Sequence, residues 1–131
     1  MDKSLVLKAF NNQFEEFFDD MLMVFPDDYH IKKTKETLLL IRKTNPKLLI
    51  QIWYSYIALK YDDEIQNLNS DFFIEKDYAA DLNDLSSAVT KKVVIGINSL
   101  RDPIRNMAAD NKIKSMEYIK NLTDLSKVYA L

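Results

Sequence analysis

LLIQIWYSYIAL, at residues 48–59, is apolar or aromatic at almost every position. A segment of this composition has no broad polar face in any regular conformation, so other elements must cover it on several sides. It is longer than a usual strand and no hairpin signal lies nearby, although Ile50 and Trp53 would also suit a strand. We therefore predict a buried central helix, with Asn45 as its cap and Pro46 at its first position.

The composition indicates one all-α domain. The chain has 131 residues, of which 47% are hydrophobic, and this is enough for the core of one domain over residues 1–131. One glycine and three prolines supply little of the turn chemistry that β-hairpins need. We predict a single-domain, all-α bundle of about five or six helices around the central apolar helix.

The sequence argues against secreted and membrane-spanning proteins. Without cysteine there is no disulfide framework, no thiolate metal site and no cysteine nucleophile, which suits a reducing compartment. Gln51, Ser55 and Lys60 interrupt the longest apolar run well before the roughly 20 residues of a membrane span. The short apolar run between Asp2 and Lys8 does not have the pattern of a signal peptide.

Charge alternates along the chain in blocks. Residues 1–30 carry two basic and seven acidic side chains, residues 31–60 seven and one, residues 61–90 one and eight, and residues 91–131 eight and four. In one interpretation these blocks lie side by side in one bundle and neutralise one another. In the other, an acidic part of one copy meets a basic surface of a second copy or of a partner protein.

Apolar residues recur at intervals of three and four, the helical period, over residues 4–24 and from Asp27 or Asp28 to about residue 43. Phe25-Pro26 ends the first of these helices, since the residue before proline is pushed out of the helical region. The buried stripe of the first helix is predicted to be Leu7, Phe10, Phe14, Phe17, Met21 and Val24.

The second half of the chain is expected to hold three more helices. We predict a short helix over residues 62–68, a turn over residues 71–76 that presses Phe72 and Phe73 inward, and a helix capped by Ser86 or Ser87. That helix would bury Val89, Val93, Ile97 and Leu100 and would contain Gly96, for which a close helix crossing is the usual reason. The last helix is predicted to begin at Asp102-Pro103 and to break or bend at Asp110-Asn111.

The last helix carries an apolar stripe almost to its end, formed by Tyr118, Leu122, Leu125 and Tyr129. Most chains fray at this point, so something must hold the stripe. One alternative is the domain's own core, because a terminal helix commonly completes a bundle. The other is an interface with a second copy or a partner protein, where tyrosine is enriched.

A basic face is predicted on the second helix, opposite a buried stripe of Ile31, Thr34, Leu38 and Ile41. Lys32, Lys35 and Lys43 gather there, with Leu39 among them. With Lys33, Arg42 and Lys47 nearby, this face is the best case for contact with nucleic acid. The acidic overall balance and the scarcity of arginine favour instead a solvated surface or one that faces an acidic partner.

The sequence contains no pattern typical of the common catalytic, metal or cofactor sites. His30 is the only histidine, and with no cysteine it cannot build a usual zinc site. The acidic clusters at Asp19-Asp20, Asp27-Asp28 and residues 62–64 lack the glycine and ligand spacing of a calcium loop. Phosphate-binding loops need several glycines, and this chain has one, so such a loop is excluded. We predict no catalytic residue, no metal site, no cofactor and no small-molecule substrate.

Five pieces of the sequence carry a resemblance: KAFNNQFEEFF at residues 8–18, VFPDD at 24–28, NPKLLIQIW at 45–53, FFIEKDY at 72–78 and YIKNLTDLS at 118–126. Together the chain resembles a family of short helical proteins of nucleocytoplasmic large DNA viruses. The resemblance implies a virus-encoded structural or adaptor protein that acts in the host cytoplasm or in the virion, and it carries over no functional residue. The alternative function is an accessory factor that contacts nucleic acid through the basic second helix.

Overall fold

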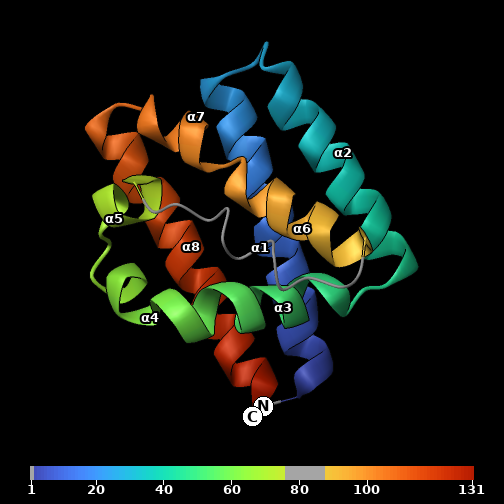
Figure 1. Ribbon diagram of the computed structural model, residues 1–131. Coiled ribbons are helices and arrows are strands. Elements are labelled where there is room, and N and C mark those ends of the chain that lie inside the picture. The colour runs from blue at the N-terminus through green and yellow to red at the C-terminus, as the bar shows by residue number, and fades with distance from the viewer. Residues whose placement is uncertain (1, 76–87) are drawn as a thin grey trace.

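The computed structural model describes residues 2–75 and 88–131, and every element in these ranges is helical (Figure 1). The predicted all-α bundle is therefore confirmed. The elements are α1 (Lys3–Val24), α2 (Tyr29–Thr44), α3 (Leu48–Trp53), the π-helix η1 (Tyr54–Ala58), α4 (Leu59–Gln66), α5 (Ser70–Glu75), α6 (Ala88–Asn98), α7 (Arg101–Arg105) and α8 (Ala109–Ala130).

The two long helices α1 and α8 form the axis of the bundle, packed antiparallel along most of their length (Figure 1). Asp2 caps α1 by accepting a hydrogen bond from the backbone N–H of Ser4 at 2.9 Å, and Asp28 caps α2 in the same way through Ile31 at 3.0 Å. α2 and α6 cover one side of the axis, and α5 and α7 lie together near the start of α8.

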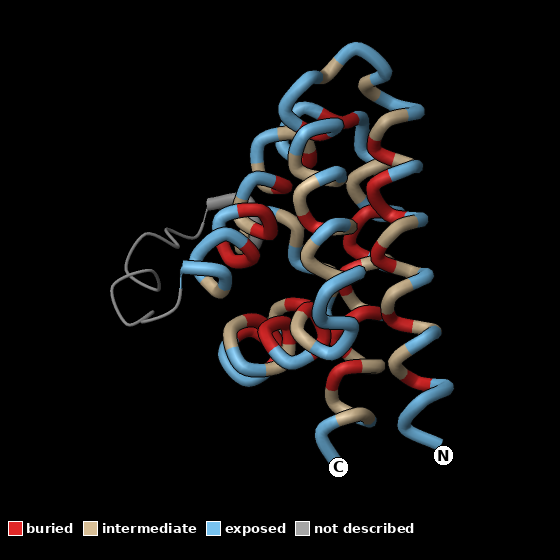
Figure 2. The backbone as a smooth tube through the Cα atoms, turned by 90° about the vertical axis from the view of Figure 1, so that its right-hand side faces the viewer, coloured by how far each residue is buried: buried red, intermediate tan, exposed pale blue. Residues whose placement is uncertain are grey.

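The central helix lies across this axis, and α3 contacts α1, α2, α6 and α8. Trp53 is completely buried, with the rings of Phe10 and Phe14 edge-on to it at centroid distances of 6.1 and 6.3 Å. Figure 2 shows that the buried positions of the surrounding helices face this interior. The prediction of a central buried helix, rather than a strand, is confirmed.

The central helical run is not a regular α-helix. Leu49, Trp53, Ile57, Tyr61 and Ile65 are all buried, at intervals of four residues. Because one α-helical turn takes 3.6 residues, this spacing would rotate the buried side chains by about 40° at each step. The wider π turn of η1 and a non-helical Tyr61, with φ −129° and ψ 18°, reduce that rotation. All five side chains of this series therefore stay buried along the run.

The start of the central run differs from the prediction. The side chain of Asn45 accepts a hydrogen bond from the backbone N–H of Lys47 at 3.3 Å, but the helix begins only at Leu48. Pro46 therefore lies in the turn before the helix. The run is kinked at Tyr61, and the predicted short helix at residues 62–68 corresponds to the part of α4 after the kink, which ends at Gln66.

The predicted turn at residues 71–76 is wrong for its described part, because Ser70–Glu75 is the helix α5. Phe72 does turn inward, and its ring lies 5.9 Å from that of Tyr61. The side chain of Phe73 and the proposed caps Ser86 and Ser87 lie outside the described residues.

The predicted last helix is divided into α7 and α8, and the division lies before Asp110-Asn111, where a break or bend is predicted. Residues 106–108 separate α7 from α8. Asp102 is not a cap but lies inside α7, where its carboxylate pairs with Arg105 at 2.9 Å. Asp110 and Asn111 do not break the chain, since they belong to the first turn of α8.

Candidate protein-interaction groove

α6 crosses α2 closely at Gly96, and the two helices run antiparallel (Figure 1). A Cβ atom added to Gly96 would lie 3.2 Å from Cδ1 of Leu38 and 3.4 Å from Cγ2 of Thr34. A side chain here would therefore require the ends of the Leu38 and Thr34 side chains to shift by a few tenths of an ångström. The close helix crossing expected from the only glycine is confirmed.

Two hollows lie beside this crossing. The larger has a volume of about 610 Å³ and lies between the start of α2, the end of α6 and α7. The smaller has a volume of about 310 Å³ and lies between the facing sides of α2 and α6. Thr34 and Ile95 line both hollows, so the hollows adjoin there and make up one region of the surface. We call it the α2–α6 groove and define it by Ile31, Lys33, Thr34, Lys92, Ile95 and Leu100.

The floor of the α2–α6 groove is apolar. Ile31, Leu38 and Leu100 are buried beneath it, whereas Ile95 is 53% exposed at the point where the two hollows meet. Helical spacing extends this line, because the exposed Leu40 follows Thr37 by three residues on α2. An exposed apolar line with polar edges is typical of a surface that binds another protein.

The walls of the smaller hollow are positively charged. Lys33 comes from α2 and Lys92 from α6, and both side chains are without an ion-pair partner in the part of the chain that the structure describes. At the other end of the groove the carboxylates are already engaged, since Asp28 caps α2 and Asp102 pairs with Arg105. The groove therefore has one open basic end.

Elsewhere the charge blocks do neutralise one another, as the first interpretation predicts. α1 and α2 are joined by Lys35 with Asp19 and by Arg42 with Glu15 at 3.4 Å. Further ion pairs join α8 to α1 through Lys114 and Asp20, at 3.1 Å, and α8 to α4 through Lys127 and Asp62, at 2.9 Å.

The three lysines predicted to share a basic face do not share one. Lys35 turns toward α1, where it pairs with Asp19. Lys32 and Lys43 are exposed on the same side of α2 but lie roughly 16 Å apart along its axis. Leu39 is half-buried, and the exposed apolar residue of this helix is Leu40.

The stripe of α8 predicted as a possible partner interface lies inside the chain's own fold. Tyr118 stacks on Phe17 of α1 at a centroid distance of 5.2 Å, and its hydroxyl donates to Asp20 at 2.7 Å. Burial and this hydrogen bond raise the pKa of Tyr118 above its ordinary value. Leu122 is completely buried, and Leu125 and Tyr129 pack half-buried against the core.

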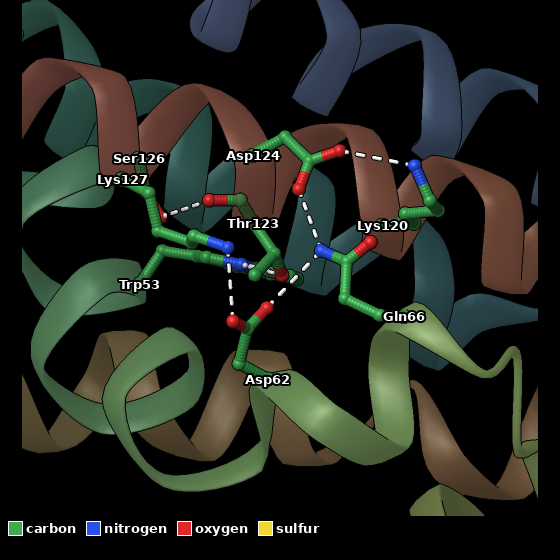
Figure 3. A network of polar contacts seen from close by, with 8 residues as sticks. All are labelled: Trp53, Asp62, Gln66, Lys120, Thr123, Asp124, Ser126 and Lys127. Carbon is green, nitrogen blue, oxygen red and sulfur yellow. Dashed lines mark hydrogen bonds and ion pairs between the residues drawn. The ribbon is translucent and has the colours of Figure 1, made fainter.

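A network of polar contacts joins α8 to the central run (Figure 3). The buried indole N–H of Trp53 donates to the hydroxyl of Thr123 at 3.0 Å, so this buried polar atom is satisfied. Nearby, Gln66 donates to Asp62 at 3.1 Å and to Asp124 at 2.6 Å. These contacts fix the rotation of α8 against α4 and serve the fold.

Asp62 makes the stability of this network depend on pH. The hydrogen bond from Lys127 holds the pKa of the Asp62 carboxyl below its ordinary value of 3.8. Asp62 therefore stabilises the fold above that pH, and the contribution is lost as the pH falls through the lowered pKa. We expect Asp62→Asn to reduce the melting temperature by a few degrees at pH 7 and by less as the pH falls below about 3.5.

Thermal melting of both proteins between pH 7 and pH 2 measures this difference. Asp27→Asn is the matched control, because Asp27 is exposed and has no ion-pair partner among the described residues. A difference between the natural chain and Asp62→Asn that is the same at pH 7 and pH 2.5 would contradict the assignment to the carboxylate.

Other sites for chemistry are not formed by the described residues. No three histidine or acidic side chains within residues 2–75 and 88–131 lie close enough to hold a metal ion. His30 is exposed at the edge of the groove, beside Tyr29. A cavity of about 30 Å³ beside Tyr118 has room for only one or two water molecules. No helix of the described ranges has the length and apolarity to cross a bilayer.

Only part of the groove was visible in the sequence. Lys33 belonged to a recognised basic segment, but its position opposite Lys92 depends on the packing of α6 against α2. Ile95 lies outside the predicted buried face of Val89, Val93, Ile97 and Leu100, but its place at the junction of two hollows depends on tertiary packing. No protein-family model matches the chain, and no curated protein or solved structure matches it either.

Proposed function

We propose that this chain is a non-catalytic interaction module that holds a helical segment of a partner protein in the α2–α6 groove. The observation that carries the proposal is the pair of adjoining hollows with buried apolar residues beneath them and the exposed Ile95 where they meet. Two helices that flank an apolar depression form the usual receptor for an amphipathic helix, which fills it with side chains spaced three and four residues apart.

A small-molecule substrate fits this groove less well than a helix does. The volume of the larger hollow, about 610 Å³, falls within the usual range for small ligands. Such sites, however, direct several free polar groups at the ligand. Here Asp28 caps α2, Asp102 pairs with Arg105, and the hydroxyl of Ser99 donates to the carbonyl of Gly96. Few groups remain to orient a small molecule.

The resemblance to proteins of large DNA viruses supports a structural or adaptor role in the host cytoplasm or in the virion. Binding a segment of another protein is the activity such a role requires. The second candidate is an accessory factor that contacts nucleic acid, and it is supported by the exposed Lys32 and Lys43 of α2. The two candidates predict different ligands: a protein segment in the groove, or nucleic acid at Lys32 and Lys43.

A neutral amphipathic peptide tests the proposal. The probe is a stapled helix of roughly 14 residues, with leucine at positions i, i+3, i+4 and i+7 and glutamine elsewhere. Added to isotope-labelled protein, it should shift the NMR signals of Thr34, Thr37 and Ile95, since these residues line the groove. Ile95→Arg should weaken binding by about tenfold or more, because it places a charge in the apolar contact.

Ile113→Arg is the control, since Ile113 is exposed to a similar extent as Ile95 (54% against 53%) but lies on α8 outside the groove. Its affinity for the peptide should equal that of the natural chain. The proposal fails if the peptide shifts no groove signal at millimolar concentration, or if both arginine variants weaken binding equally.

A further inference from the structure

We infer that the segment held in the α2–α6 groove is acidic, an amphipathic helix whose carboxylates pair with Lys33 and Lys92 while its apolar side chains cover Ile95. This inference rests on the proposed function and adds the charge of the partner to it. It is carried by the distribution of unpaired cations over the surface, which is separate from the shape of the groove.

Six cations elsewhere in the described chain have an ion-pair partner. The ion pairs engage Lys35, Arg42, Arg105, Lys114, Lys120 and Lys127. The lysines beside the groove differ from these, because they take part in no ion pair among the described residues. Lys33 on α2 and Lys92 on α6, which line the smaller hollow, are exposed and have no ion-pair partner among residues 2–75 and 88–131. Their sequence neighbours Lys32 and Lys91 are also exposed and unpaired within these ranges.

These four charges lie in surroundings that contain little to balance them. α6 has no acidic residue, and α2 has only Glu36. Like charges on the two walls of a depression reinforce the positive potential between them, which attracts an anionic ligand and speeds its association. A partner with carboxylates therefore relieves a repulsion that α2 and α6 themselves leave unbalanced.

The arrangement of charged and apolar groups specifies the pattern of the partner. Lys33, Lys92 and Ile95 line the same hollow of about 310 Å³, with Leu38 at its floor. An apolar side chain that enters this hollow lies between the two ammonium groups. A helix meets all three contacts with an apolar anchor flanked by acidic residues three or four positions away on either side.

The apolar floor favours a protein segment over nucleic acid. A phosphate backbone pairs with lysine but has no apolar group to cover Ile95, which is 53% exposed. The nearest cations of this surface are all lysines, whereas base and phosphate recognition commonly uses the bidentate geometry of arginine.

Three peptides with one apolar stripe and different polar faces, carrying glutamate, glutamine or lysine, test the inference. At low ionic strength the glutamate peptide should bind roughly tenfold more tightly than the lysine peptide, with the glutamine peptide between them. The difference should shrink as salt is raised, since exposed ion pairs are screened. The double variant Lys33→Glu with Lys92→Glu should reverse the order.

Lys8→Glu with Lys43→Glu is the matched control, because both lysines are exposed, unpaired and outside the groove. It changes the net charge equally and should keep the original order of affinities. Equal binding of all three peptides, or an order that Lys33→Glu with Lys92→Glu leaves unchanged, overturns the inference while the proposed function stands. Failure of every peptide to bind overturns the proposed function itself.

A duplex oligonucleotide of about 12 base pairs completes the experiment. It should displace the glutamate peptide only weakly at physiological salt. If instead it binds more tightly than the glutamate peptide and shifts the signals of Lys32 and Lys43, the surface is a nucleic-acid site and the inference of an acidic helix is wrong.

Discussion

Replacing Trp53 by alanine is expected to lower the free energy of unfolding by about 3–5 kcal/mol. The indole is completely buried where α3 meets α1 and α8, and both Phe10 and Phe14 lie edge-on to it. Truncation removes those contacts and leaves a cavity that the long helices are too constrained to fill. Because domains of this size are stable by only about 5–15 kcal/mol, much of the stability would be lost.

Urea unfolding followed by circular dichroism measures this loss. In the natural chain Trp53, the only tryptophan, gives a second signal, since a buried indole emits at short wavelength and resists quenchers. If Trp53→Ala reduces the unfolding free energy by less than about 1 kcal/mol, the central position of this side chain is contradicted.

Two milder variants separate packing from hydrogen bonding. Trp53→Phe keeps an aromatic ring but removes the N–H that donates to Thr123, and Thr123→Val removes the acceptor. Each alone leaves one buried group unpaired at a cost of about 1–3 kcal/mol. Combining them removes both groups, so the double variant should be more stable than the sum of the single effects implies.

The helical fold could be predicted because the relevant signals are local. The three- and four-residue spacing of Phe10, Phe14, Phe17 and Met21 identifies a buried face, and Phe25-Pro26 marks the end of α1. The π turn could not be placed in the same way. The repeat of four from Leu49 to Ile65 is visible in the sequence, but it implies a wider turn only once all five positions are known to be buried.

The failures in the second half have a tertiary cause. Ser70–Glu75 has little helical periodicity of its own and is packed between α4, α7 and α8. The break at residues 106–108 contains neither proline nor glycine, so the sequence gives no local signal for it. Charge presents the same difficulty, because the sequence shows that Lys33 and Lys35 are basic but not that only Lys35 has an acidic partner.

Leu122→Asp is expected to unfold the domain, which distinguishes the two alternatives for the α8 stripe. Leu122 has no exposed surface and belongs to the central core cluster. The substitution removes roughly 2–5 kcal/mol of apolar contact, and an unpaired carboxylate in the same place costs several kcal/mol more. Together these losses exceed the lower range of domain stability. Circular dichroism should show loss of helix at 25 °C, also in the double variant with Leu125→Asp.

Asn121→Asp is the control for the added charge. Asn121 precedes Leu122 on α8 and is exposed, so an isosteric carboxylate there should change stability by less than about 0.5 kcal/mol. Light scattering before and after mutation completes the comparison. If the natural chain is an oligomer that Leu122→Asp converts to a folded monomer, the stripe is an interface between copies, and the packing of Leu122 in the core is wrong. Loss of helix from a chain that was already monomeric instead assigns the stripe to the core, so that Leu122 and Leu125 are not available to a partner.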